Sequence, residues 1–441
     1  MSAPLPHASV ATKGATARER LSDAWLLAHR WKGRVFFALV DQGLYSLTNF
    51  LLTILYASWL PLDTFGHYVV VWTVSLFVEA IQISLIVDSL PAIVSRHGRR
   101  NQTRIDAAAF WVVVGYSVVT SILLALMALI VSPWQPVYVG GLLALALANP
   151  FQRLYLFVRR LSYIRDRQEI AAVLALLYGV VSIGGAFVLF RTGAISLTAI
   201  ISLWGVGALA AVVAAIAFGI GRPRTMRPAN VAWLALEIWR SGRWLSGAAV
   251  AGWMSNSAIF PLIAVTSGAA NTGVIRALQN LLTPVVQFNA ALHLAVLPRV
   301  ADKVADVGDH YARWFARRGT AVFTAIAVAY CTVVLAGAHL ILPVVYGKPE
   351  ITAATYLLWP LALVVVLDAL RQASAISLLA NRRTRIVFVA RWLALLVFVG
   401  GGAVLNAWLG FPGILWGTAA ASATGAAILL GAALSKHRKG R

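Results

Sequence analysis

A polar stripe follows one face of the apolar stretch at 274–297. Arg276, Asn280, Thr283 and Gln287 fall within an arc of about 60° if the stretch is a helix. Arg276 has no acidic residue three or four positions away. Guanidinium groups bind phosphate through paired hydrogen bonds, so an arginine with amide neighbours suits an anionic headgroup. We therefore predict that Arg276, Asn280 and Gln287 bind substrate. The alternative is that Arg276 snorkels to the outer membrane interface.

Two further stretches carry polar residues where a transport path would need them. Gln42, Tyr45, Ser46 and Asn49 share one helical face in the stretch at 36–58, because they are three, four and seven positions apart. Asn256 lies near the middle of a later stretch. Ionisable and amide groups inside a membrane usually face the bundle interior or a water-filled cavity. We expect Gln42, Asn49 and Asn256 to line the substrate path.

Charged residues inside apolar stretches cost about 2.5–3.5 kcal/mol each on insertion scales, so each needs a reason to be there. Asp368 and Arg371 are three residues apart and are expected to pair along a helix, either structurally or with a role in substrate binding. Glu79 is a candidate proton or cation site, or a partner of Arg276 across a cavity. Asp41 is a candidate coupling acid, although its position near a cytoplasmic end also fits a structural role.

The composition requires these residues to sit on membrane helices. The 441 residues are 60% hydrophobic and 12% charged, with a mean hydropathy of +0.80, whereas a soluble domain is about 25% charged. A membrane span needs about 20 apolar residues. The fold class is therefore an all-α polytopic membrane protein of about 12 transmembrane helices. The predicted spans are 36–58, 68–94, 107–131, 137–158, 170–189, 197–220, 245–266, 274–297, 320–345, 355–379, 386–408 and 414–434.

The net charge of +22 is a topology signal. Of the 37 Lys and Arg residues, 31 lie in the two tails and in alternate loops, and only Arg191 and Lys348 lie in the opposite loops. Cytoplasmic loops carry such an excess, so both termini are predicted to be cytoplasmic, and nucleic-acid binding has no independent support. The N-terminal segment lacks the apolar core of a cleavable signal peptide. Cys331 is the only cysteine, which excludes a disulfide framework and a Cys-rich metal site.

The predicted organisation is two six-helix lobes with basic segments between and beside them. Two segments that mix Trp, Leu and Arg, Leu21–Arg34 and Val231–Arg243, are expected to lie as helices on the membrane surface, where they anchor the bundle. The divisions are a cytoplasmic tail at 1–35, an N-lobe at 36–220, a connector at 221–244, a C-lobe at 245–434 and a basic tail at 435–441.

The two lobes resemble each other in sequence. Gly33 matches Gly242 at an offset of 209, and three other pairs match at an offset of 207. These pairs are Asn49 with Asn256, Gly66 with Gly273, and Pro91 with Pro298. Each lobe has six spans that begin on the same side, so the repeats are parallel. Transporters built from repeats place substrate near the repeat interface.

Several short motifs then point to a family. The run from Asp41 to Phe50 (DQGLYSLTNF), Trp59-Leu60 and the Phe65-Gly66-His67-Tyr68 turn resemble the opening of the Wzx-type polysaccharide flippases. Leu297-Pro298 and the basic loop with Gly308-Asp309 resemble the connector that follows the eighth span in that family. The family belongs to the multidrug/oligosaccharidyl-lipid/polysaccharide superfamily, whose members fold as two six-helix lobes around a central cleft.

This resemblance implies a function. A Wzx-type flippase moves an undecaprenyl-diphosphate-linked oligosaccharide from the cytoplasmic to the periplasmic leaflet of the bacterial inner membrane by alternating access. The implied partners are this lipid-linked substrate, membrane lipids, and a polysaccharide polymerase with its export machinery. Arg276 falls where related lipid-linked flippases carry an arginine in the eighth span. The first span offers Asp41 and no arginine, unlike the peptidoglycan-precursor flippase, so the sugar stays unspecified.

Other classes remain open. A cation-coupled drug exporter of the same superfamily would use Glu79 or Asp41 as its coupling acid. A major-facilitator transporter is also six plus six, and Arg96-His97-Gly98-Arg99-Arg100 matches the end of that family's loop motif, although Ser95 stands where an Asp is expected. A glycosyltransferase or polymerase usually needs a sizeable periplasmic loop, and a scaffold would leave the polar stripes unexplained. The chain has no nucleotide-binding or zinc-protease motif, and it is not expected to be an enzyme.

Overall fold

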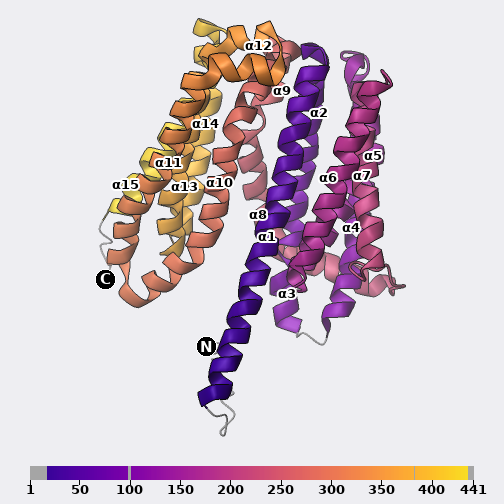
Figure 1. The fold of residues 1–441 in the computed structure, drawn as a ribbon, viewed down its shortest axis with the longest axis vertical. Coiled ribbons are helices and arrows are strands. Elements are labelled where there is room, and N and C mark those ends of the chain that lie inside the picture. The colour runs from indigo at the N-terminus through magenta and orange to yellow at the C-terminus, as the bar shows by residue number, and fades with distance from the viewer. Residues whose placement is uncertain (1–16, 98–100, 382, 436–441) are drawn as a thin grey trace.

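A computed structural model describes residues 17–97, 101–381 and 383–435 (Figure 1). All regular structure within these residues is helical. The α-helices are α1 (Ala17–Trp59), α2 (Leu62–Gln82), α3 (Leu90–His97), α4 (Gln102–Val131), α5 (Val139–Ile164), α6 (Gln168–Arg191), α7 (Leu197–Ala217), α8 (Pro228–Asn256), α9 (Ile259–Ser267), α10 (Ala269–Val307), α11 (Asp309–Tyr346), α12 (Pro349–Ala353), α13 (Leu358–Ala380), α14 (Thr384–Leu409) and α15 (Phe411–Leu434). Short π- and 3₁₀-helical turns flank α2, α5 and α13 at Ile83–Val87, Pro136–Tyr138 and Ala354–Leu357. The all-α polytopic fold expected from composition is confirmed.

The number of spans differs by one from the sequence prediction. Among the described residues, eleven segments are long and apolar enough to cross a membrane, and each overlaps one of the twelve predicted spans. The remaining prediction, 274–297, lies in α10, a helix of 39 residues that carries the polar stripe. At 1.5 Å per residue this helix is about 58 Å long, more than the roughly 30 Å of a bilayer core. α10 therefore has the length to cross, and most of its residues between 281 and 297 are apolar.

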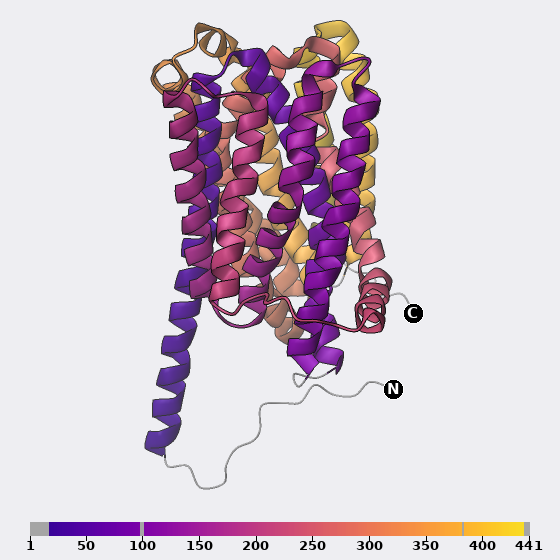
Figure 2. The same ribbon diagram turned by 90° about the vertical axis from the view of Figure 1, so that its right-hand side faces the viewer.

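The helices form two groups that meet along α2 and α10. Figure 1 shows α4 to α7 on one side of the molecule and α11 to α15 on the other, with α1, α2, α8 and α10 between them. Figure 2 shows that α1 begins and α15 ends toward the same end of the bundle, and that α1 extends well beyond it. We call α1–α7 the N-lobe and α8–α15 the C-lobe.

The two lobes touch at the end of the bundle where α1 finishes. Gly66 and Gly273, which the repeat relates, lie in the first turns of α2 and α10 and pack against each other's helix. A Cβ atom at Gly66 would lie 1.8 Å from the carbonyl oxygen of Ala269, and one at Gly273 would lie 2.8 Å from that of Leu62. Only glycine permits this approach of the two backbones.

Two side chains reinforce this contact between the lobes. The Ser58 hydroxyl donates to the carbonyl oxygen of Val345 at 3.1 Å, and the Lys348 ammonium donates to the carbonyl oxygen of Leu60. The lobes are thus joined by hydrogen bonds at the end remote from the start of α1. We refer to this contact, made by Gly66, Gly273, Ser58 and Lys348, as the outer contact.

The two expected surface helices are parts of longer helices. Leu21–Arg34 belongs to α1, which runs as one helix into the bundle (Figure 2), and its place on the membrane surface stays a prediction. Val231–Arg243 forms the first half of α8. It buries Leu234 and Ile238 against the N-lobe and leaves Trp233, Leu236 and Trp239 between 40% and 58% exposed. This amphipathic pattern matches the expectation for a surface-lying segment.

Candidate substrate cavity

A cavity of about 530 Å³ lies between the lobes. Its lining comes from α1, α2 and α5–α7 of the N-lobe and from α9, α10, α13 and α15 of the C-lobe, together with Ser257 at the end of α8. Eight of the ten predicted site residues line it: Gln42, Asn49, Glu79, Arg276, Asn280, Gln287, Asp368 and Arg371. The predicted residues include all four charged residues of the lining and four of its seven amide residues, and the sequence missed Gln152, Gln279 and Gln372.

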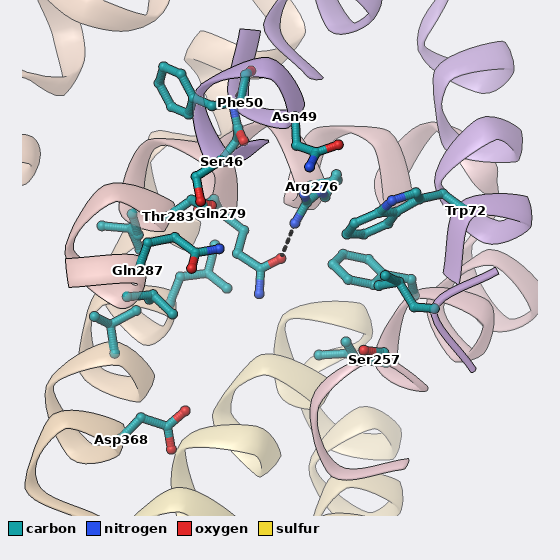
Figure 3. Close-up of a pocket in the computed structure, with 18 of the residues that line it drawn as sticks. Ser46, Asn49, Phe50, Trp72, Ser257, Arg276, Gln279, Thr283, Gln287 and Asp368 are labelled. Atoms are coloured by element: carbon teal, nitrogen blue, oxygen red, sulfur yellow. Dashed lines mark hydrogen bonds between the residues drawn. The ribbon is translucent and has the colours of Figure 1, made fainter. Parts of the chain in front are cut away.

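Arg276 is held on the cavity wall by an aromatic ring and an amide. Its guanidinium carbon lies 4.2 Å from the centre of the Trp72 ring, and its Nη1 donates to Oε1 of Gln279 at 3.1 Å (Figure 3). Cation–π contact and one neutral acceptor orient the group without cancelling its charge. Arg276 forms no ion pair with any residue that the structure describes. It does not snorkel outward, and it presents its positive charge to the cavity.

The remaining residues of the predicted stripe lie beside Arg276 on α10. Thr283 and Gln287 line the cavity further along the same helix (Figure 3). Asn280 is buried and donates from Nδ2 to the carbonyl oxygen of Phe50 at 3.3 Å, while its Oδ1 has no partner among the described residues. The stripe thus joins α10 to α1 and offers neutral donors and acceptors beside one fixed positive charge.

α1 supplies the facing wall. Asn49 donates to the carbonyl oxygen of Tyr45 at 3.0 Å, and Gln42 donates to the Ser46 hydroxyl at 3.4 Å. All four residues line the cavity, as their helical spacing predicted. Of the predicted site residues, Asn256 falls outside the side chains that the structure describes, so its place in the cavity stays a prediction.

Glu79 pairs within its own lobe. Its Oε2 lies 4.0 Å from Nη2 of Arg153, which also donates to the Ser75 hydroxyl at 3.3 Å. The alternative in which Glu79 pairs with Arg276 is therefore wrong. The Arg153 side chain is 1% exposed, and its Nε and Nη1 atoms find no acceptor in the described part of the chain. The sequence placed Arg153 inside the fourth predicted span, but no spacing rule linked it to a residue on α2.

Asp41 lies away from the cavity lining, in contrast to its predicted place at a coupling site. Its two oxygens accept hydrogen bonds from Nε and Nη2 of Arg159 at 2.7 and 2.9 Å, and the Tyr163 hydroxyl donates to it at 2.5 Å. Arg159 and Asp41 are both buried. The apolar window ended the fourth span at residue 158, whereas α5 continues to Ile164 and carries Arg159 into the lobe. The geometry gives Asp41 a structural role.

Asp368 and Arg371 form the ion pair predicted from their spacing. Nε of Arg371 lies 3.0 Å from Oδ1 of Asp368, and the Ser422 hydroxyl donates to the same oxygen at 3.4 Å. The two side chains are 27% and 24% exposed and line the cavity on the C-lobe side. They balance each other's charge where they meet the cavity.

The charged residues of the cavity lining leave one positive charge uncompensated. Glu79 faces Arg153 behind it and Asp368 is paired with Arg371, so Arg276 stands without an acidic partner in the described lining. A positive charge in a partly desolvated cavity favours an anionic ligand. The described residues contain no cluster of three or more His, Cys, Asp or Glu side chains that could hold a metal ion.

Comparisons with solved structures place this geometry in a known architecture. An inward-facing MATE family multidrug transporter of the MOP superfamily matches with a TM-score of 0.72 and 12% identity, over 90% of this chain and 97% of the other. The lipid II flippase MurJ, in an inward closed conformation, matches with a TM-score of 0.65 and 10% identity, over 90% and 87%. The chain has the fold of the MOP superfamily transporters.

A third match is to another transporter of the same fold. A MOP superfamily transporter from Pyrococcus furiosus, described as having a binding pocket of reverse polarity, matches with a TM-score of 0.67 and 10% identity, over 90% of this chain and 93% of the other. No family profile and no curated protein matches this chain. The likeness to these structures concerns the fold, and the Wzx-type assignment stays a prediction.

Proposed function

We propose that the chain is a flippase that moves an undecaprenyl-diphosphate-linked oligosaccharide repeat unit from the cytoplasmic to the periplasmic leaflet of the bacterial inner membrane. In this proposal both termini are cytoplasmic, and the lobes alternate in opening the cavity to each side. The observation that carries the proposal is the uncompensated Arg276 guanidinium, exposed to the cavity among amide side chains. A diphosphate is the part of such a substrate that a fixed cation recognises.

The other lining residues fit the sugar part of this substrate. Asn49, Asn280 and Gln287 offer amide donors and acceptors that match hydroxyl groups, and Trp72 offers a ring face beside the guanidinium. A volume of about 530 Å³ is in the range of small-molecule sites and holds a headgroup. The long polyprenyl chain is expected to stay in the bilayer. It then never contacts water, so its movement between leaflets carries no hydrophobic penalty.

Transport by alternating access requires the outer contact to open. In the observed state, the backbones of the two lobes meet at Gly66 and Gly273, and we propose that this contact closes the cavity on that side. We propose that the loaded transporter separates this contact while the lobes close at the other end. To open the outer contact, two hydrogen bonds must break and the backbones at Gly66 and Gly273 must separate. Opening it disrupts fewer interactions than unpacking either lobe would.

Glu79 is the carboxylate that we propose for proton coupling, with Asp368 as the second candidate. Glu79 is 24% exposed and lines the cavity, and Arg153 lies behind it at 4.0 Å. Protonation of Glu79 would leave the Arg153 charge uncompensated next to the cavity. The binding of a proton and the binding of an anion would then favour each other, as linkage requires.

The proposal is tested by deleting the gene and measuring lipid-linked oligosaccharide on the cytoplasmic leaflet. We expect a completed repeat unit to accumulate, the intact gene to relieve the accumulation, and the Arg276→Gln variant to fail to relieve it. Arg191→Gln is the matched control, because Arg191 is the exposed last residue of α6 and is not part of the cavity lining. Absence of accumulation in the deletion strain would overturn the proposal.

A cation-coupled exporter of small molecules is the second candidate. The observations that favour it are the 0.72 TM-score with a multidrug transporter and the two carboxylates, Glu79 and Asp368, in the lining. Under this candidate, deletion would change sensitivity to small organic cations and leave the lipid-linked oligosaccharide unchanged. A polysaccharide polymerase and its export machinery are proposed partners only under the flippase function.

A further inference from the structure

A second pocket of about 110 Å³ opens beside the central cavity within the C-lobe. It lies between α8, α13, α14 and α15, and it shares Asp368, Arg371, Thr418 and Ser422 with the lining of the central cavity. The two spaces therefore adjoin each other at the Asp368–Arg371 ion pair. We call the smaller one the side pocket.

The side pocket contains more positive than negative charge. Arg371 and Arg391 both line it, and Asp368 is its one acidic lining residue. Because Asp368 already accepts from Arg371 at 3.0 Å, it is not available to neutralise Arg391. Arg391 forms no ion pair or hydrogen bond with any residue within the described part of the chain.

Small residues keep the side pocket open. Its walls include Gly252, Ala390, Ala394 and Gly425. A Cβ atom at Gly425 would lie 3.4 Å from Cδ of Arg371 and 3.6 Å from Cβ of Ala394. A larger side chain there would occupy the space in front of the Arg371 guanidinium. The pocket is thus a space between two arginines rather than a gap left by poor packing.

The side pocket also reaches the surface of the C-lobe. Arg391 lies two turns into α14 and is exposed. Its neighbours Phe388, Trp392 and Leu396 are 52%, 41% and 65% exposed, as expected for side chains that face lipid. An arginine about 10 Å along a lipid-facing helix is costly unless an anion or water meets it.

We propose that Arg371 and Arg391 bind the phosphate groups of a lipid-linked diphosphate at this opening between α8 and α14. The diphosphate would bind at this opening first and pass from it to Arg276 during transport. The sugars would then lie in the central cavity, and the lipid chain would leave sideways into the bilayer past Phe388 and Trp392. Two guanidinium groups at one opening match the two phosphates of a diphosphate. This inference rests on the proposed flippase function and adds the place where headgroup and tail separate.

The test is a binding measurement on the purified full-length chain in detergent, with geranylgeranyl diphosphate as the probe. We expect Arg391→Gln to weaken binding about tenfold, the effect of losing a charged hydrogen bond. Arg385→Gln is the matched control on the exposed first turn of the same helix and is expected to bind like the unchanged protein. Unchanged binding in Arg391→Gln would overturn the proposal.

Competitors separate the possible sources of phosphate. If the side pocket binds the lipid-linked diphosphate, inorganic diphosphate and phosphatidylglycerol should compete only weakly with the probe. Equal competition by inorganic diphosphate would show a site for free phosphate, and equal competition by phosphatidylglycerol would show a site for ordinary membrane lipid. Either result would overturn the proposal.

A second variant tests the pocket without removing a charge. Gly425→Leu fills the space beside Arg371 and should weaken probe binding even if Arg391→Gln does not fold. If the unchanged protein binds no geranylgeranyl diphosphate, the proposed function fails with the inference. If it binds the probe and Arg276→Gln weakens binding while Arg391→Gln and Gly425→Leu do not, only the inference fails.

Discussion

The interiors of the two lobes hold charge in opposite ways. In the N-lobe the buried acids Asp41 and Asp106 pair with Arg159 and Arg165, and the partly exposed Glu79 faces Arg153. To the linings of the central cavity and the side pocket the C-lobe contributes one acid, Asp368, and three arginines: Arg276, Arg371 and Arg391. The N-lobe interior is therefore balanced, whereas the C-lobe interior carries an excess of positive charge that meets the cavity and the side pocket.

Charged residues therefore have different roles in the two lobes: they hold helices together in the N-lobe and are available to a ligand in the C-lobe. Asp41 and Arg159 lie 2.7 Å apart, both buried, so their charges hold α1 against α5. Arg276 rests on an aromatic ring and leaves its charge to a ligand. A buried pair costs several kcal/mol when one partner is removed, whereas an unpaired charge in a cavity contributes little to folding. Changes in the N-lobe pairs should affect stability, and changes at the C-lobe arginines should affect transport.

The largest expected effect tests the N-lobe side of this comparison. Asp41→Asn leaves the Arg159 charge buried without a partner, so the free energy of unfolding should fall by about 3–5 kcal/mol. Thermal unfolding in detergent measures it. The control is Glu169→Gln, because Glu169 and Arg167 form an ion pair in which both side chains are 48% exposed, and such pairs contribute about 0–1 kcal/mol. Equal effects of the two variants would contradict the assignment of Asp41 to a structural pair.

The next effect concerns the contact between the lobes. Gly66→Val places side-chain atoms where the Ala269 backbone lies, so the outer contact cannot form and transport should be lost. A cysteine at Ser58, labelled from the periplasmic side, should react faster in this variant. Gly115→Val is the matched control, since a Cβ atom at Gly115 meets nothing within 4 Å. Normal transport by Gly66→Val would show that the outer contact does not have to close.

The third prediction tests whether the Asp368–Arg371 ion pair of the C-lobe is structural or binds substrate, and its expected effect is smaller. Asp368→Arg combined with Arg371→Asp keeps the pair but moves the positive charge three residues along α13. Because Arg371 lines both the cavity and the side pocket, we expect normal thermal stability and about tenfold slower transport. If the double variant transports at the normal rate, the pair is structural and the C-lobe resembles the N-lobe at this position.

The smallest expected effect concerns the carboxylate beside Arg153. Glu79→Gln removes the negative charge that faces Arg153, so the affinity for a diphosphate ligand should rise severalfold. A binding measurement on the purified variant checks this, with Glu169→Gln as the control. Unchanged affinity in Glu79→Gln would remove Glu79 from coupling and leave Asp368 as the candidate.

Composition predicted the fold class, and helical periodicity predicted which residues of a single helix face the cavity. The 100° spacing placed Arg276 and Gln287 on one face of α10 because such patterns are local to one helix. The same reasoning could not find Arg153, Arg159 or the ring of Trp72, since each acts through a residue on another helix.

The ends of the helices were also difficult to predict from the sequence. An apolar window finds only the apolar part of a helix, and α5 continues beyond it through further residues that the lobe buries. Arg159 was therefore counted with a loop, and Asp41 lost its partner. The side pocket was missed for a related reason, because Arg371 and Arg391 lie on different helices and only packing brings them to one opening.

The most direct test of the central claim, that Arg276 binds an anionic headgroup, is transport by the purified protein in liposomes. The substrate would be a fluorescent lipid-diphosphate-linked oligosaccharide, with the organic cation rhodamine 6G as the alternative. We predict that the unchanged protein moves the lipid-linked anion, that Arg276→Gln is at least about tenfold slower, and that Arg276→Lys retains part of the rate. An unchanged rate in Arg276→Gln, or transport of the cation alone, would contradict the account.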